Sequence, residues 1–328
     1  MREMNERMKK RAAELLSDGT VGRVIGWSEG EFSYDMTPTV FDTAAEIEND
    51  FVYNEFCGAN VSKYAMKEQR KDAETKLLVF LKPCDSYSFA RLVSEHRIDR
   101  DKVYVIGIPC DEMADIDLIK RHDIDGVQGI EREGDRYIVR TIYGDSEIDV
   151  NEAIAERCVN CKSKRHTVYD ELLGEEGEVN AECGRFDEVE RLESMTSEER
   201  YAFWQGELSR CIRCNACRNV CPACTCEQCV FDNRESGVEQ KAAADSFEEK
   251  LFHIIRAFHV AGRCTDCGEC SRVCPEHIPL HLLNRKFIRD IDELYGEFQA
   301  GEGEERTPLT SFKYDDAEPS VVRERGNG

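Results

Sequence analysis

Two short cysteine runs near the C-terminus constrain this chain more than any other feature. CIRCNACRNVCP and CTDCGECSRVCP both follow the pattern C-x2-C-x2-C-x3-C-P. This spacing is typical of bacterial [4Fe–4S] centres. Three closely spaced thiolates wrap one face of a cubane, and the fourth is directed to a second cluster. The sequence therefore predicts two clusters that exchange their fourth ligands.

The exchange defines two predicted ligand sets. The first consists of Cys211, Cys214, Cys217 and Cys274. The second consists of Cys264, Cys267, Cys270 and Cys221. Zinc sites are the alternative, since they commonly pair two C-x2-C units, but two complete cluster patterns disfavour them. The long connection and the predicted flanking helices resemble the α-helical ferredoxins of succinate dehydrogenase and of heterodisulfide reductase small subunits.

Further cysteines lie outside these runs. CPACTCEQC adds Cys224, Cys226 and Cys229 just after the first run. They either join another metal centre, with Cys183 as a candidate fourth ligand, or are free thiols beside a cluster. The second reading is favoured because a convincing fourth ligand is lacking. Cys57 is interpreted as a packed cysteine near the N-terminal site, with ligation as the alternative.

Two apolar segments in the N-terminal half end in the same three residues. LVFLKPCD (78–85) ends in Pro83, Cys84 and Asp85, and YVIGIPCD (104–111) ends with Cys110 in the matching place. Strands at 76–81 and 102–108, with a helix at 86–96 between them, predict a β-α-β unit with parallel strands. Ligands of such sheets bind beyond the carboxyl ends of the strands, so the two thiols are expected to converge.

A third cluster is predicted at this sheet edge. CVNC adds Cys158 and Cys161, and these two thiols with Cys84 and Cys110 make four ligands. One alternative is that these are ordinary buried cysteines that bind no metal. Another is that they bind zinc in place of an iron–sulfur cluster. Two matched Pro-Cys-Asp ends and one C-x2-C favour ligation of a [4Fe–4S] cluster.

The remaining patterns set the expected architecture. A charged helix is predicted at 1–17, further helices at 111–122 and 151–157, and an antiparallel meander at 127–150. Beyond a polar linker the pattern is helical. The predicted fold is an α/β domain with a partly parallel sheet and a small meander, followed by an α-helical dicluster ferredoxin domain. Expected boundaries are 1–175, a linker at 176–190, 191–299, and a loose acidic tail at 300–328.

Charge and composition exclude several function classes. The formal net charge of −23 disfavours nucleic-acid binding, because phosphate backbones attract Lys and Arg. The 17 cysteines do not suit a disulfide scaffold, since such scaffolds are short secreted chains. No signal-peptide pattern and no membrane-length apolar run is visible. A cytoplasmic protein is expected.

A basic patch follows the CVNC pair. KSKRH contains Lys162, Lys164 and Arg165 within a very acidic chain. It is either a solvated loop or an anion grip for a cofactor phosphate or a substrate carboxylate. No G-x-G-x-x-G dinucleotide fingerprint is visible.

The segments LKPCDSYSFARL, VIGIPCD and CVNCKSKRHTVYDELLGE resemble the β subunits of coenzyme F420-reducing hydrogenases and dehydrogenases. The resemblance covers roughly residues 20–175. It implies FAD, a [4Fe–4S] cluster and hydride exchange with the deazaflavin coenzyme. By resemblance Cys84, Cys110, Cys158 and Cys161 match the cluster ligands, and Asp170 and Gly174 match the ending of the motif.

The expected function is that of an iron–sulfur electron-transfer subunit in an anaerobic oxidoreductase complex. It would relay electrons between a flavin or deazaflavin site and partner subunits, with F420 or NAD(P) as candidate coenzyme. One rival is a relay subunit that has clusters but no flavin and no substrate of its own. A second rival is a zinc-rich scaffold protein.

Overall fold

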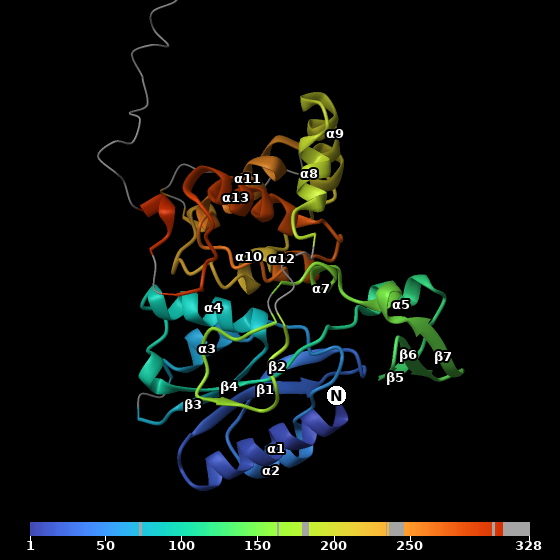
Figure 1. The fold of residues 1–328 in the computed structure, drawn as a ribbon, viewed down its shortest axis with the longest axis vertical. Helices are drawn as coiled ribbons and strands as arrows, with labels where there is room; N and C mark the ends of the chain where they lie inside the picture. The colour runs from blue at the N-terminus through green and yellow to red at the C-terminus, as the bar shows by residue number, and fades with distance from the viewer. Residues whose placement is uncertain are drawn as a thin grey trace, which may run out of the picture.

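The computed structural model describes residues 1–71, 74–162, 164–178, 184–233, 235, 246–303 and 306–310, with the backbone alone at 246–249. A layered α/β region lies next to a helical C-terminal region, and a small separate sheet projects at one side (Figure 1). The predicted fold class is confirmed on each of these points.

The main sheet has five strands in the order β2-β1-β3-β4-β8. Its strands are β1 (Arg23–Glu29), β2 (Met36–Phe41), β3 (Leu77–Leu81), β4 (Val103–Gly107) and β8 (Glu171–Leu172). β2 is antiparallel to β1, and the other neighbours are parallel. Sequence patterning missed β8, because a two-residue strand leaves no alternation to detect.

β3 and β4 form the buried centre of this sheet. All five residues of β3 are buried, as are four of five in β4. The two strands pair in parallel from Leu77 opposite Val103 to Leu81 opposite Gly107. Near-continuous apolar runs are what a sheet covered on both faces requires. The strands therefore end side by side at one edge.

Helices cover both faces of the main sheet. α1 (Arg2–Ser17) and α2 (Ala44–Asp50) lie on one face, and α3 (Ser62–Glu68) and α4 (Pro83–Ser94) lie on the other, toward the C-terminal region (Figure 1). The buried side of α1 places Met8, Ala12 and Leu15 in the core.

Helix boundaries differ from the predicted ones at three places. α4 begins at Pro83, so Cys84 lies in its first turn; proline suits this position because its fixed φ matches the helix. α5 covers only Ile116–Arg121. The predicted helix at 151–157 is two short helices, α6 (Val150–Ala153) and α7 (Glu156–Val159).

The predicted meander is an antiparallel sheet in the order β5-β6-β7. Its strands are β5 (Val127–Glu133), β6 (Arg136–Thr141) and β7 (Gly144–Asp149). Tyr137 and Val139 from β6 lie fully buried in a core shared with Ile119 of α5. This sheet is therefore a small unit with its own core.

The C-terminal region is helical. Its helices are α8 (Asp187–Glu193), α9 (Ser197–Leu208), α10 (Ala216–Val220), α11 (Ser246–Val260), α12 (Glu269–Arg272) and α13 (Leu280–Tyr295). α9 begins with a capping box formed by Thr196 and Glu199. α11 connects the two cysteine runs, and no helix among the described residues is long and apolar enough to span a membrane.

Arg157 of α7 joins the two halves of the chain. It donates hydrogen bonds to the carbonyl oxygens of Gly58 and of Cys267, and it pairs with Glu269. Glu269 is fully buried and also pairs with Arg272. Burial alone would raise the pKa of Glu269, but the two arginines hold it at about 2.

Candidate metal centres

One cavity at the carboxyl ends of β3 and β4 is lined by four cysteines. These are Cys84, Cys110, Cys158 and Cys161, the four that the sequence grouped together. Cys84 reaches it from the first turn of α4, Cys110 from the loop after β4, and the other two from α7 and the turn that follows it. The parallel pairing of β3 and β4 is what brings the first two thiols to one edge.

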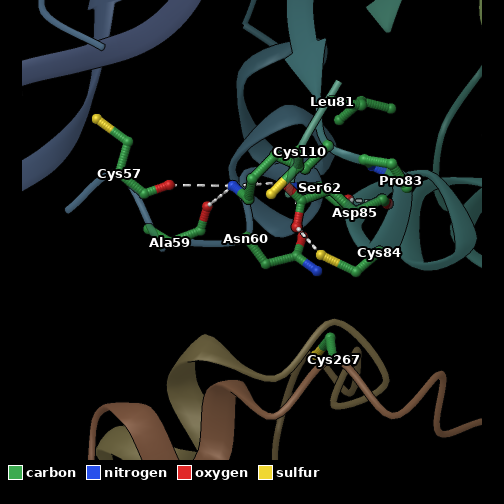
Figure 2. A network of polar contacts seen from close by, with 12 residues as sticks. Cys57, Ala59, Asn60, Ser62, Leu81, Pro83, Cys84, Asp85, Cys110 and Cys267 are labelled. Atoms are coloured by element: carbon green, nitrogen blue, oxygen red, sulfur yellow. Dashed lines mark hydrogen bonds and ion pairs between the residues drawn. The ribbon is translucent and has the colours of Figure 1, made fainter. Parts of the chain in front are cut away.

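A buried cation supports this edge of the sheet. Lys82 is 1% exposed, and its Nζ lies 2.8 Å from Oδ2 of Asp85. Nζ also donates to the carbonyl oxygens of Cys57 at 3.1 Å and Ala59 at 3.0 Å (Figure 2). Lys82 thereby ties the loop around Cys57 to the start of α4.

The thiols of this cavity are held in a low-dielectric setting. Burial raises the pKa of both Cys84 and Cys110, while the ammonium of Lys82 lowers it for both. A buried thiolate needs a nearby cation or a metal to be stable. The donor set therefore fits an iron–sulfur cluster, whose iron ions are bound by thiolates.

The C-terminal region closes the same cavity. Cys267 of the second cysteine run lines it together with Thr265, Asp266 and Arg185. Figure 2 shows Cys84 and Cys110 on one side and Cys267 on a loop across from them. The hydroxyl groups of Ser88 and Thr265 lie 2.7 Å apart and join the two sides.

A second cavity gathers the first predicted ferredoxin set. It is lined by Cys211, Cys214, Cys217 and Cys274. Cys274 comes from the second run, as the exchanged pattern requires. Nε2 of the buried His253 lies 3.2 Å from Sγ of Cys211. Burial lowers the pKa of His253 to about 3, so its ring is neutral.

The second ferredoxin set is also drawn together. Burial raises the pKa of Cys264, Cys267 and Cys270, and Cys221 of the first run is among the charged neighbours of all three. Cys221 and Cys264 pack around the same buried Val260. Nδ2 of Asn284 lies 3.6 Å from Sγ of Cys270.

The two cysteine loops share one unusual backbone conformation. Arg213 and Asp266 stand at matching positions with φ of 54° and 61°. Asn215 and Gly268 match as well, with φ of 62° and 70°. Left-handed non-glycine residues are uncommon and concentrate at functional sites. The repeated conformation indicates that both loops are built for the same task.

The additional cysteines lie beside the second set. The Cys221 and Cys224 thiols are hydrogen-bonded, which lowers the pKa of Cys221 and raises that of Cys224. Cys226 is exposed, and Cys229 contacts Arg218. Cys183 lies outside the described residues. Within the described ranges, no three His, Cys, Asp or Glu side chains converge to hold a single metal ion.

The basic patch contributes two of its three residues to the cavity at β3 and β4. Lys162 and Lys164 line it, and Nζ of Lys164 donates to the carbonyl oxygen of Asp111. Arg165 is exposed and is not among the lining residues. Sequence reasoning missed Lys82, Arg157 and His253. Of these three residues only Lys82 is marked in the sequence, because it is a single basic residue directly after an apolar strand.

Several known proteins are similar to this chain in sequence. Residues 207–278 match the 4Fe-4S dicluster domain family. The F420-dependent formate dehydrogenase subunit beta of Methanocaldococcus jannaschii is 24% identical over 85% of this chain and 88% of its own length. The F420-dependent formate dehydrogenase 1 subunit beta of Methanococcus maripaludis is 24% identical over 66% of this chain and 71% of its length.

Two further similarities are partial. Putative ferredoxin-3 of Sinorhizobium fredii is 36% identical over 81 residues, which cover 24% of this chain and 75% of that protein. A chain in the F420-reducing [NiFe] hydrogenase complex of Methanosarcina barkeri aligns with a TM-score of 0.40 and 14% identity, over 62% of this chain and 86% of that one.

Proposed function

We propose that this chain is a member of the family of coenzyme F420 hydrogenase and dehydrogenase β subunits and relays electrons through its C-terminal 4Fe-4S dicluster domain. It is an iron–sulfur electron-transfer subunit of an oxidoreductase complex. The proposed division is an N-terminal domain at 1–175, a linker at 176–190 and a ferredoxin domain at 191–299. A cytoplasmic, anaerobic setting is part of the proposal.

We assign three ligand sets in the proposal. The N-terminal set is Cys84, Cys110, Cys158 and Cys161; the near ferredoxin set is Cys264, Cys267, Cys270 and Cys221; the far ferredoxin set is Cys211, Cys214, Cys217 and Cys274. The observation that carries the proposal is that Cys267 lines the same cavity as the whole N-terminal set. The three sets would hold [4Fe–4S] clusters, which would supply one-electron transfer at potentials tuned by their surroundings.

The residues arrange these sets in series. The N-terminal set faces the near set across one cavity. The near and far sets are interleaved, because each takes one cysteine from the other run. In the far set Cys214 is exposed, and its neighbour Ile212 is 62% exposed. The exposure of Cys214 leaves this end of the series open to a partner subunit.

A flavin is supported by the family resemblance and by a third cavity, which no cysteine lines. This cavity has a volume of about 330 Å³ and includes the aromatic rings of Tyr34 and Phe56 and the guanidinium groups of Arg121 and Arg272. Such a volume and such a mixture are typical of cofactor sites, and arginine suits phosphate groups. Arg157 lines both this cavity and the cavity of the N-terminal cysteine set, called the thiol cavity below. A bound FAD would supply conversion between hydride and single-electron transfer.

The coenzyme in this proposal is F420, with NAD(P) as the alternative. The names of the two formate dehydrogenase relatives state F420 dependence. Lys162 and Lys164 give the thiol cavity two cations in a chain with a net charge of −23. They would attract the anionic groups of either coenzyme.

The proposal is tested by mixing the anaerobically purified chain with reduced F420 or with NADPH. Reduced F420 should bleach the cluster absorbance, and NADPH should do so far more slowly. Acid extraction should release about one FAD per chain. Arg121→Ser should lower that FAD content, while Arg136→Ser, on the distant meander surface, should leave it unchanged.

Two outcomes favour the rivals. Iron without extractable flavin, and no reduction by either coenzyme, would favour a relay subunit that lacks its own substrate. Zinc in place of iron would favour the scaffold protein.

A further inference from the structure

Arg256 of α11 is a buried cation without a visible partner. It is 3% exposed, and none of its three guanidinium nitrogens has a hydrogen-bond partner among the described residues. Leaving a charged group buried and unpaired is costly. Among the described residues, no carboxylate pairs with this positive charge.

The side chains that interact with the charge of Arg256 are those of cysteines. They are Cys270, Cys217, Cys221 and Cys224. Cys217 belongs to the proposed far ferredoxin set, and Cys221 and Cys270 belong to the near set. Arg256 thus interacts with cysteines of both sets, and each set gains negative charge when four thiolates bind iron. No carboxylate is among these neighbours.

The other basic residues nearby are already engaged. Nζ of Lys63 donates to the carbonyl oxygens of Arg218 at 3.2 Å and Cys224 at 2.8 Å. Arg218 pairs with Asp232, and Arg263 pairs with Glu95. Arg256 differs from them because its guanidinium N–H groups make no hydrogen bond to the described residues.

We propose that Arg256 is a positioning residue that serves both ferredoxin clusters at once, donating to their sulfur atoms and raising both reduction potentials. The inference rests on the proposed ligand sets. Reduction adds negative charge to a cluster, so a fixed cation in a low-dielectric site favours the reduced form. Because arginine stays protonated at all accessible pH values, its effect should not vary with pH.

The test compares Arg256→Gln with the wild-type chain in EPR-monitored redox titrations, after iron has been quantified. The glutamine variant should retain the iron and lower both ferredoxin potentials, each by about tenfold in the reduction equilibrium, or about 59 mV for one electron. Arg256→Lys should restore most of the shift. Arg191→Gln, which removes an equal charge at an exposed position of α8, should leave both potentials unchanged.

Unchanged potentials in an iron-replete Arg256→Gln variant would overturn the proposal. If that variant loses ferredoxin iron, Arg256→Met is measured beside Arg256→Lys. If only the lysine variant retains ferredoxin iron, a positive charge is needed at this position and the proposal is supported. If the glutamine, methionine and lysine variants all lose the iron, the proposal is overturned. Failure of the proposed function would be seen in the wild-type chain itself, as missing ferredoxin signals.

Discussion

Cys84, in the first turn of α4, and Cys267, in the second cysteine run, line one cavity between the two halves of the chain. Neither residue is near the other in sequence, and each belongs to a different proposed ligand set. Their shared cavity is what connects the α/β region to the ferredoxin region.

Cys84→Ser should remove the iron of one cluster and leave the ferredoxin pair intact. A serine hydroxyl is a poor substitute for a thiolate ligand, so about four iron atoms should be lost. Cys57→Ser is the matched control, because Cys57 is buried nearby but does not line the cavity. Anaerobic iron analysis of both variants checks the prediction, and equal iron in the two would contradict it.

Gly268→Ala should weaken the near ferredoxin site. Gly268 has φ of +70°, and an added Cβ would lie 2.6 Å from Cβ of Arg157. Both the left-handed conformation and the contact resist a side chain. Asn215→Gly, at the matching position of the first run, should be tolerated because glycine accepts φ of 62°. Iron content separates the two variants; full iron in Gly268→Ala would refute the prediction.

Arg157→Met should loosen the junction between the two halves. It removes one partner of the buried Glu269, a change that typically costs about 3–5 kcal/mol, with the lower end expected because Arg272 remains. Arg136→Met is the control, since its pair with Glu147 is exposed and such pairs contribute about 0–1 kcal/mol. Urea unfolding under anaerobic conditions measures both. Similar decreases in the free energy of unfolding of the two variants would show that Arg157 stabilises the chain no more than an exposed arginine does.

Stability should fall as pH decreases below about 6.5, partly because of His281. Burial lowers the pKa of His281 to about 4, and its ring lies 2.9 Å from Oγ of Ser271. Between the two pKa values the unfolded chain binds the additional proton, so stability decreases by up to about 1.4 kcal/mol per pH unit. His281→Asn should flatten this slope without abolishing it, since His253 acts in the same direction. Urea midpoints at pH 7.5 and 5.5 give the comparison, and an unchanged slope would count against it.

The sequence predicted the parts of this molecule that depend on local spacing. Both cysteine runs, the strands ending near Cys84 and Cys110 and the meander follow from short patterns that determine local conformation. α4 begins at Pro83 and not at the predicted residue 86. Proline can end a strand or begin a helix, and tertiary packing decides which of the two occurs.

Buried cations could not be predicted in the same way. Lys82 and Arg256 are ordinary basic residues in the sequence, and their meaning depends on which thiols and carbonyl groups the fold places around them. Arg157 likewise gains its role from Gly58 and Glu269, which lie far away along the chain. Such partners are brought together only by tertiary packing.

Quantifying iron and acid-labile sulfide in the anaerobically purified wild-type chain tests the three-site relay most directly. Three [4Fe–4S] clusters require about twelve iron and about twelve sulfide atoms per chain, and this is the predicted result. About eight of each would leave the Cys84 site without a cluster and would contradict the proposed path from the α/β region to the ferredoxin region.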